Sequence, residues 1–446
     1  MTRPGGRHRG RPGKFWNAHF AEGNGGGIFM EKSAFARSAR NAEEIPSLKE
    51  IYARFFALGN IVACRFRDDL SPESAERVRL LQRHFGILTP ENEMKPAVLR
   101  PGAEGPGAWD WSCAERLLDF AEKRGFRFHG HALAWHSQSP RWLAPQGISR
   151  AEAIANLEGH IEAVMLRFGN RVESWDALNE AVADGGPEQF ARDGADIPWH
   201  LDAWDWTQKG ALRKVPDESC QTDWLRAIGP EYAEIAFGAA RRAARENGLD
   251  VMLYYNDYNL DIPRKRFAVY HMVRDINKRH LDARGERLID AIGMQGHYWL
   301  SVPRLAKGGA PPPATLVSNV RDSLARFASL GVNLSVTELD VAAGSDGILD
   351  PGQELSQAVM YARLFSLFKS FSKARPGVLR RVSIWGVDDG SSWRSFHSPL
   401  LFDRAFKPKL AFWAAADPGG FLREHAPMHM GEFADDAFEP DCNGHD

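Results

Sequence analysis

The chain has 446 residues, of which 43% are hydrophobic, and its formal net charge at pH 7 is -2. This length suits either two ordinary domains or one large α/β barrel, a fold that runs from about 200 to over 400 residues. A nearly neutral charge argues against nucleic acid and anionic membranes as partners, because both need a concentrated basic surface. The 14 Trp residues indicate that some rings serve a binding site for a flat ligand.

The two ends of the chain have the composition of solvated tails. The first 14 residues contain no acid, and the stretch after Arg423 contains no Lys or Arg. We therefore expect a disordered basic leader at 1–46, one folded domain at 47–423 and an acidic tail at 424–446. The leader lacks the apolar core of a secretory signal, so the chain as given is expected to be cytoplasmic, or secreted if a signal precedes it.

The four Cys residues are scattered without a paired spacing, which indicates free thiols rather than a disulfide framework or a zinc site. No run near either end is apolar and long enough to span a bilayer. There is also no Gly-rich loop between a strand and a helix that would bind phosphate. We expect no cofactor and no metal.

Short β-branched or aromatic runs alternate along the chain with longer segments of helical period, which is typical of βαβ units and a parallel sheet. Several of the helical segments, such as 150–169 and 229–248, end in the Gly expected just beyond a helix. Eight units without a break in composition favour a single (β/α)8 TIM barrel in the α/β class. The predicted strands are 55–64, 84–89, 126–135, 172–179, 251–256, 289–296, 332–339 and 382–387.

Two insertions interrupt this rhythm. Residues 184–228 are rich in Gly, Pro, Trp and charge, and residues 301–313 are rich in Gly and Pro. Both follow a strand, so we expect them as loops on the C-terminal face of the barrel, where such barrels keep their active sites.

Polar and aromatic side chains gather at the C-terminal ends of the predicted strands, which converge on one rim in a closed barrel. Taken singly, each has an ordinary explanation as a helix cap, a core aromatic or a hydrogen-bonded His. Together they predict a site. These residues are Glu91, Asn92, His131, Trp135, Asn179, Glu180, Asn256, Asp257, Tyr258, Gln295, His297, Glu338, Asp340, Trp385, Asp388 and Trp393.

Two carboxyl groups among amides, imidazoles and aromatic rings suit the hydrolysis of a glycosidic bond. One protonated carboxyl can protonate the leaving oxygen while one ionised carboxylate faces the anomeric carbon. Hydrogen bonds to hydroxyls and stacking on sugar faces supply the position.

The motifs in these positions resemble glycoside hydrolase family 10, a family of endo-1,4-β-xylanases built on a (β/α)8 barrel. The resemblance runs from about residue 48 to 418. It rests on "LTPENEMK" (88–95), "GHALAWHSQSPRW" (130–142), "WDALNEA" (175–181), "YNDYN" (255–259), "IGMQGH" (292–297), "VTELDV" (336–341) and "WGVDDGSSW" (385–393).

The resemblance implies that Glu180 is the general acid and base and that Glu338 is the nucleophile of a retaining mechanism. A nearby ionised Glu338 raises the pKa of Glu180 and keeps it protonated until the sugar ester removes that charge. Asn179 is implied to bond the sugar 2-hydroxyl and His297 to bond the nucleophile. Asp340 lies on the same strand face as Glu338, where it can hold the His297 ring.

The remaining matches imply substrate binding, and the expected partner is xylan or a xylo-oligosaccharide, bound by a monomer. Xylose lacks a hydroxymethyl arm, so walls formed by Trp385 and Trp393 would admit xylose and crowd glucose. Two departures from the family pattern stand out: Pro96 follows Lys95 where the family has Trp, and the insertion after the fourth strand is long and Trp-rich. The implied binding residues are Glu91, Asn92, Lys95, His131, Trp135, Gln138, Tyr258, Gln295, Trp385 and Trp393.

Three alternatives remain open. A zinc hydrolase would use the His residues of "HGH" (129–131) with Glu180, His297 and Asp388 as ligands. A carbohydrate-binding barrel without turnover would have lost one carboxylate, and here both are present. A relative acting on short oligosaccharides rather than polymer is not separated from an endo-xylanase by sequence.

Overall fold

Parallel strands closed into a ring form the centre of the fold. The computed structural model describes residues 45–64, 72–102, 109–184, 204–207, 210–216, 221–281, 285–300 and 313–426. The predictions for residues 1–44 and 427–446, and for nearly all of the loop 301–313, lie outside these residues. Within them the strands are β1 (Ala57–Val62), β2 (Ile87–Pro90), β3 (Arg127–Gly130), β4 (Ser174–Asn179), β5 (Met252–Asp257), β6 (Ala291–Met294), β7 (His297–Trp299), β8 (Asn333–Ala342) and β9 (Leu379–Ile384).

The ring closes because every barrel strand has a parallel neighbour on both sides. β1 pairs with β2 and with β9, and β6 pairs with both β5 and β8. The eight members are therefore β1 to β6, β8 and β9, while β7 pairs only with the upper part of β8. This confirms the predicted eight-stranded barrel.

The sixth predicted strand, 289–296, differs from the structure because it is broken after Met294. Gly296 has a φ of 84°, which L-residues rarely adopt, and the chain resumes as β7 at His297. A Cβ at Gly296 would also approach Val336 Cγ1 to 3.0 Å. The break gives Gln295 and His297 different orientations from those of a regular strand.

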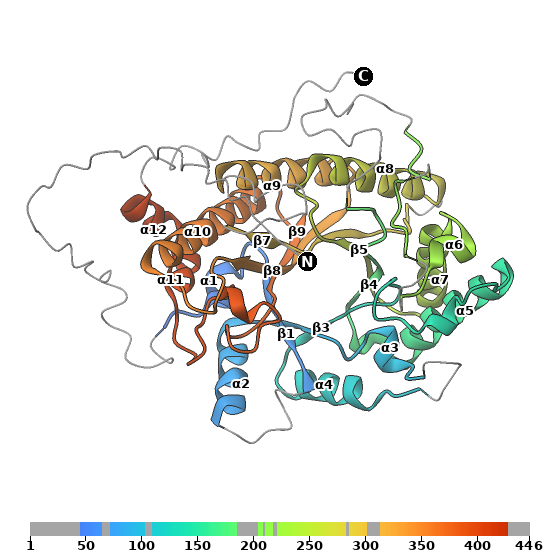
Figure 1. Ribbon diagram of the computed structural model, residues 1–446, viewed down its shortest axis with the longest axis horizontal. Coiled ribbons are helices and arrows are strands. Elements are labelled where there is room, and N and C mark those ends of the chain that lie inside the picture. The colour runs from blue at the N-terminus through green and yellow to red at the C-terminus, as the bar shows by residue number, and fades with distance from the viewer. Residues whose placement is uncertain are drawn as a thin grey trace, which may run out of the picture. The chain divides into compact units, whose positions relative to one another are not determined.

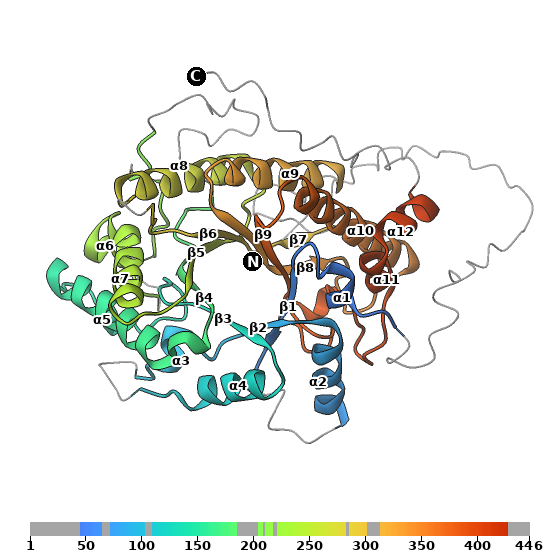
Figure 2. The same cartoon turned by 180° about the vertical axis from the view of Figure 1, so that it is seen from behind.

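Helices surround the ring of strands, as the two opposite views in Figures 1 and 2 show. The five helical segments predicted around 113–125, 150–169, 229–248, 316–331 and 355–371 are all helices. The helices are α1 (Leu48–Tyr52), α2 (Pro72–His84), α3 (Pro96–Leu99), α4 (Ser112–Lys123), α5 (Arg150–Phe168), α6 (Trp224–Ile228), α7 (Tyr232–Glu246), α8 (Pro263–Arg279), α9 (Pro313–Ala328), α10 (Pro351–Ala374), α11 (Leu410–Ala416) and α12 (Pro418–His425).

Local sequence signals define where the longest helices begin. Ser149 and Glu152 form a reciprocal capping box at the start of α5, and Asp350 and Gln353 do the same at the start of α10. α10 is apolar on more than one face, because α11 and α12 cover the side away from the barrel. Ala358, Ala362, Ala414, Phe421 and Leu422 form that second cluster.

The described ends of the barrel extend slightly beyond the predicted domain limits. Ile45 is buried, and its carbonyl accepts a hydrogen bond from Arg83 at 3.0 Å. At the other end, α12 continues to His425.

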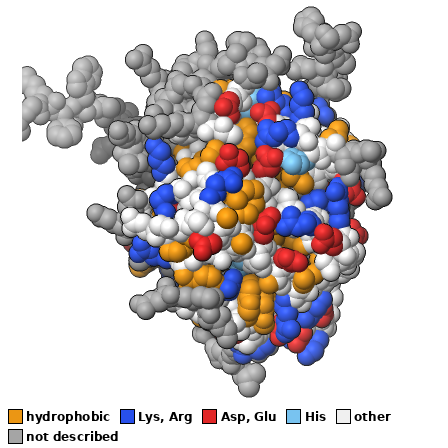
Figure 3. Space-filling view, turned by 90° about the vertical axis from the view of Figure 1, so that its right-hand side faces the viewer, with side chains coloured by type: hydrophobic (Ala, Val, Ile, Leu, Met, Phe, Trp, Pro, Cys, Tyr) orange, Lys and Arg blue, Asp and Glu red, His pale blue; other side chains and the backbone are white. Residues whose placement is uncertain are grey.

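Basic, acidic and hydrophobic side chains are interspersed on the face shown in Figure 3. Within the described residues, no helix combines the length and the apolar character needed to cross a membrane.

The described parts of the 184–228 insertion are packed rather than loose. Trp204 and Trp206 are 4% and 2% exposed. Trp204 contacts the rings of Phe267 and His271 on α8 at 5.2 and 5.7 Å. These two indoles thus belong to packing outside the barrel, while Trp199 lies outside the described residues.

Gly130 on β3 offers a test of how tightly the barrel is packed. A Cβ there would lie 2.1 Å from the ring of the buried Trp175 on the paired strand. We expect Gly130→Ala to lower the free energy of unfolding by about 1–3 kcal/mol through overpacking. Gly159→Ala is the control: it lies on the exposed side of α5 with open space, and should stabilise by up to about 1 kcal/mol. Urea unfolding measures both, and an equal effect of the two substitutions would contradict this packing.

Candidate active site

A cleft of about 520 Å³ opens where the barrel strands end. Most of the predicted site residues line it. Four others, Asn179, Asn256, Asp257 and Asp340, lie behind it and are bonded to lining residues, and Asp388 does not line it. The lining residues are Glu91, Asn92, Lys95, His131, Trp135, Gln138, Glu180, Asp184, Tyr258, Asn259, Gln295, His297, Trp299, Glu338, Trp385, Trp393 and Arg394.

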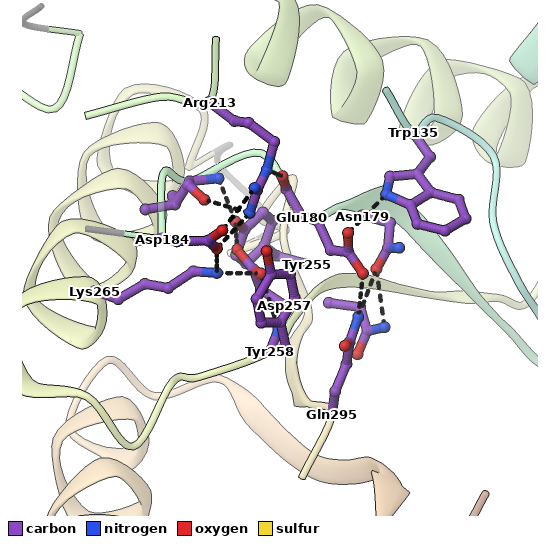
Figure 4. Close-up of polar contacts among 12 residues, drawn as sticks. Trp135, Asn179, Glu180, Asp184, Arg213, Tyr255, Asp257, Tyr258, Lys265 and Gln295 are labelled. Atoms are coloured by element: carbon purple, nitrogen blue, oxygen red, sulfur yellow. Dashed lines mark hydrogen bonds and ion pairs between the residues drawn. The ribbon is translucent and has the colours of Figure 1, made fainter. Parts of the chain in front are cut away.

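Glu180 follows directly after β4 with a φ of 55°, a left-handed conformation that residues other than Gly seldom adopt. Its N–H donates to the Asn256 carbonyl on β5 at 2.9 Å, which holds this backbone against the sheet. Its carboxyl oxygens accept hydrogen bonds from Trp135 Nε1 at 3.0 Å and from Gln295 Nε2 at 2.9 Å (Figure 4). Neutral donors therefore hold both oxygens.

Burial raises the pKa of the Glu180 carboxyl above its ordinary value, and the charges of Asp257 and Glu338 raise it further. The hydrogen bond from Gln295 and the charge of Arg213 act in the opposite direction without reversing the shift. A carboxyl in this environment retains its proton to a higher pH than an exposed Glu, as a general acid requires.

Glu338 lies on β8, and its N–H donates to the Gln295 carbonyl across the break in the sixth strand at 2.7 Å. Its Oε1 accepts from Asn256 Nδ2 at 2.9 Å, and its Oε2 is 3.1 Å from His297 Nε2. Burial alone would raise the pKa of Glu338, but the hydrogen bond and charge of His297 lower it below the ordinary value. Glu338 is therefore the carboxylate that stays ionised.

His297 connects Glu338 to a second carboxylate, Asp340. His297 Nδ1 lies 2.9 Å from Asp340 Oδ2, and Asp340 also accepts from Trp393 Nε1 at 3.0 Å and Arg394 Nη1 at 2.9 Å. Burial disfavours the imidazolium, but Asp340 and the Glu338 hydrogen bond together raise the pKa of His297 to about 9. The ring is thus charged at neutral pH and donates from both nitrogens.

Asn179, at the end of β4, is held by its carbonyl oxygen. That oxygen accepts from Asn256 Nδ2 at 3.0 Å and from Gln295 Nε2 at 3.4 Å. Its own Nδ2 is buried without a hydrogen-bond partner among the described residues. A buried amide donor without a partner costs free energy unless a ligand satisfies it, which suits a sugar hydroxyl.

On the side of β2 and β3, the cleft is lined by a cation and a series of polar groups. Lys95 Nζ donates to Asn92 Oδ1 at 2.9 Å and lies 5.1 Å from the Trp135 ring centroid. His131 Nδ1 is 2.8 Å from the buried carboxylate of Asp176. Both contacts fix the direction of side chains that face the cleft.

Pro96, the departure noted beside Lys95, occupies the first position of α3, where its missing N–H is not needed. The next N–H, of Ala97, donates to the carbonyl of Gln138 at 2.8 Å. The proline thereby starts a short helix that ties two lining segments together.

Aromatic rings wall the cleft near His297. Trp385 is 6% exposed and meets His131 and His297 edge-on, with centroids 5.7 and 6.4 Å apart. Trp393 is 56% exposed and meets His297 at 5.0 Å. The Trp385 ring is therefore fixed in the wall of the cleft, whereas much of the Trp393 ring is exposed.

Four lining residues were missed by the sequence analysis: Asp184, Asn259, Trp299 and Arg394. Trp299 follows His297 by two residues and so shares its strand face, a spacing that was available as a signal. Arg394 directly follows Trp393 and lies 4.3 Å from the Trp299 ring. Asn259 ends the quoted motif "YNDYN" (255–259), which was a signal for it, whereas Asp184 reaches the cleft only through the course of its loop, which no local pattern reveals.

Asp388 does not line the cleft, so its assignment to the site was wrong. Its Oδ2 accepts from Arg77 Nε on α2 at 2.9 Å and from Ser391 Oγ at 2.7 Å, which hold it away from the cleft. His129, another proposed zinc ligand, lies 3.1 Å from Asp176 inside the barrel. Among the described residues, no three His, Cys, Asp or Glu side chains are grouped so as to hold a metal ion.

The charge on His297 makes stability depend on pH. Because its folded pKa of about 9 exceeds the ordinary 6.5, its stabilising contribution is fully present below pH 6.5 and is lost as the pH rises through 9. We expect Asp340→Asn to remove much of a contribution of at most about 3 kcal/mol.

Urea unfolding at pH 6 and pH 10 gives the free energy of unfolding of wild type and of Asp340→Asn. The difference between the two proteins should be smaller at pH 10. The exposed Asp346→Asn is the control and should follow the wild type at both values. An Asp340→Asn effect that is identical at the two pH values would contradict the charged His297.

Comparison with known proteins places this geometry in a family. Residues 47–418 match the family model described as glycosyl hydrolase family 10. The beta-1,4-xylanase of Dictyoglomus thermophilum is 33% identical, covering 85% of this chain and 93% of that protein. Endo-1,4-beta-xylanase A of Thermotoga maritima is 31% identical over 84% of this chain, which spans only 31% of that longer protein.

A solved structure gives the same result. The intracellular xylanase of Thermoanaerobacterium saccharolyticum, in a complex with xylotetraose, has a TM-score of 0.65 and 28% identity, covering 83% of this chain and 98% of that one. With the matched region spanning the whole barrel, the chain belongs to glycosyl hydrolase family 10, a retaining family of glycoside hydrolases that acts on xylan.

Proposed function

We propose that this chain is an endo-1,4-β-xylanase in which Glu180 is the general acid and base and Glu338 is the nucleophile. The observation that carries the assignment is the opposite environment of the two carboxyls. Neutral donors and the Asp257 charge surround Glu180, whereas a charged His297 and the Asn256 amide donate to Glu338.

In the first step, a carboxylate oxygen of Glu338 forms a bond to the anomeric carbon as the glycosidic bond breaks. Glu180 transfers its proton to the departing oxygen, and the sugar remains on Glu338 as an ester. Esterification removes the Glu338 charge, so the pKa of Glu180 falls and its carboxylate is stable.

In the second step, Glu180 takes a proton from water as that water attacks the anomeric carbon. The ester bond to Glu338 breaks, and the sugar leaves with its original configuration after two inversions. The Asn179 Nδ2 donor is suited to the 2-hydroxyl of the sugar, a group whose hydrogen bonds contribute to stabilising the transition state.

The proposed catalytic unit is residues 47–423, and the proposed state is a monomer. All the side chains in this mechanism come from one chain and lie between Glu91 and Arg394. That arrangement needs no second copy to complete the cleft.

Stereochemistry and rescue by azide test the two roles together. We expect proton NMR of early xylohexaose digestion to show the β-anomer first, and Glu338→Ala and Glu180→Ala to lose at least about a hundredfold in rate. With dinitrophenyl β-xylobioside, whose leaving group needs no proton, azide can replace a missing carboxylate and should give an α-glycosyl azide with Glu338→Ala and a β-glycosyl azide with Glu180→Ala. Early α-anomer would reject the retaining mechanism, and exchange of the two azide products would reverse the assignment of the two carboxyls.

Selectivity for xylose over glucose is proposed to come from the wall of Trp385 and Trp393. We expect wild type to cleave an aryl xylobioside at least about tenfold faster than the matching cellobioside, as crowding of one extra group is worth ~1–3 kcal/mol. Trp393→Ala should reduce the ratio of kcat/KM for the xylobioside to kcat/KM for the cellobioside. Phe396→Ala, an exposed aromatic outside the cleft lining, should not. A preference for cellobiosides would reject the proposal.

A further inference from the structure

A short piece of the inserted segment is bound to the chain that follows β4. Ala183 N–H donates to the Ala211 carbonyl at 3.0 Å, and Arg213 N–H donates to the Ala181 carbonyl at 2.8 Å. Val182 and Leu212 form an isolated antiparallel bridge between them. Residues 211–213 therefore act as a partner strand for the residues just beyond Glu180.

The side chain of Arg213 extends this pairing along the whole turn. Its Nε donates to the Glu180 carbonyl at 3.0 Å and its Nη2 to the Val182 carbonyl at 3.2 Å. Its two terminal nitrogens also hold the Asp184 carboxylate, at 3.1 and 2.8 Å (Figure 4). One planar guanidinium thus spans the backbone from residue 180 to residue 184.

The other side of the turn is held by β5. Val182 N–H donates to Tyr255 Oη at 3.1 Å, and that hydroxyl donates to Asp257 Oδ2 at 2.5 Å. The backbone carbonyl of Val182 is therefore held by Arg213, and its N–H is held by Tyr255. The unusual backbone angle at Glu180 is maintained by contacts on both of its sides.

Charges alternate around this turn. Lys265 on α8 is fully buried, with Nζ 2.7 Å from Asp257 Oδ1 and 3.4 Å from Asp184 Oδ1. Arg213 is the second cation and has 17% of its side chain exposed. Asp257 and Asp184 are the two acids, so each cation neutralises carboxylates that would otherwise face Glu180 uncompensated.

We propose that Arg213 is a positioning residue for the acid and base: its guanidinium holds the turn that carries Glu180 and compensates the negative charge beside it. This inference rests on the proposed function of Glu180. It assigns to the insertion after β4 a role in the chemistry itself, in addition to any effect on the length of the cleft.

The direction of the charge effect follows from the groups around Glu180. Burial, Asp257 and Glu338 raise the pKa of Glu180, and Arg213 lowers it, so loss of Arg213 raises it further. The charged or titratable groups that act on Glu180 are Asp257 on β5, Tyr258 after it, Glu338 on β8, Lys95 before α3, and Arg213. Of these groups, Asp257 and Tyr258 are also acted on by the Arg213 charge, which lowers the pKa of each.

The experiment compares Arg213→Met, Arg213→Lys and the control Lys214→Met, which removes one positive charge from the exposed neighbouring residue. The substrates are phenyl β-xylobioside, whose leaving group needs a proton, and dinitrophenyl β-xylobioside, whose leaving group does not. We expect Arg213→Met to slow the phenyl substrate at least about tenfold more than the dinitrophenyl substrate. In the pH profile of kcat/KM for Arg213→Met, the basic limb should move to higher pH.

Arg213→Lys keeps the charge without the planar arrangement of donors, so its basic limb should stay near that of wild type while its loss with the phenyl substrate remains. If Arg213→Met does not fold, as judged by circular dichroism, the ratio of the two substrates with Arg213→Lys decides. Lys214→Met should match wild type throughout.

Equal slowing of both substrates by Arg213→Met with an unmoved basic limb would overturn the proposal, because a merely structural role predicts that result. The same conclusion follows if Arg213→Lys retains the wild-type ratio while Arg213→Met is unfolded. Failure of wild type to cleave either xylobioside would instead reject the proposed function. If wild type is active and Glu180→Ala is impaired, but the Arg213 variants match wild type, the proposed function stands and only this inference is rejected.

Discussion

Two buried carboxyl groups that face one cleft cannot both be freely ionised, and this constraint organises the site. The structure resolves it by surrounding each group differently. Glu338 receives donors from a charged His297 and from Asn256, while Glu180 receives neutral donors from Trp135 and Gln295. The charge of Glu338 is in turn one reason why the pKa of Glu180 is raised, so the state of each carboxyl depends on the other.

The barrel can impose this difference because its strands depart from regular geometry at the rim. The turn at Gly296 separates Gln295, which reaches Glu180, from His297, which reaches Glu338. The left-handed backbone at Glu180 plays a similar part at the end of β4. A regular strand would have placed the adjacent residues Asn179 and Glu180 on opposite faces, and the left-handed backbone at Glu180 instead places its side chain in the cleft.

A second set of charged residues lies behind the two carboxyls and forms hydrogen bonds with the residues around them. Asp340 accepts hydrogen bonds from His297, Trp393 and Arg394, and Asp257 accepts them from Lys265 and Tyr255. The first arrangement keeps an imidazolium beside the nucleophile, and the second supplies a negative charge that raises the pKa of the acid. In its proposed role, Arg213 belongs to this set of residues, which links an insertion on the outside of the barrel to the chemistry inside it.

The sequence by itself determined the eight β/α units, the rim on which the site lies and most of the cleft-lining residues, because strand ends and family motifs are local in the chain. It misplaced Asp388, which also follows a strand but turns towards Arg77, and it left out Arg394, whose neighbour Trp393 was recognised. The resemblance already implied which carboxyl is protonated. Only the tertiary structure decided which donors surround each carboxyl, which Trp residues pack against α8 and which wall the cleft, and what the insertion touches. Burial, charge compensation and hydrogen bonds between residues far apart in the chain set these properties, and no local pattern encodes such distances.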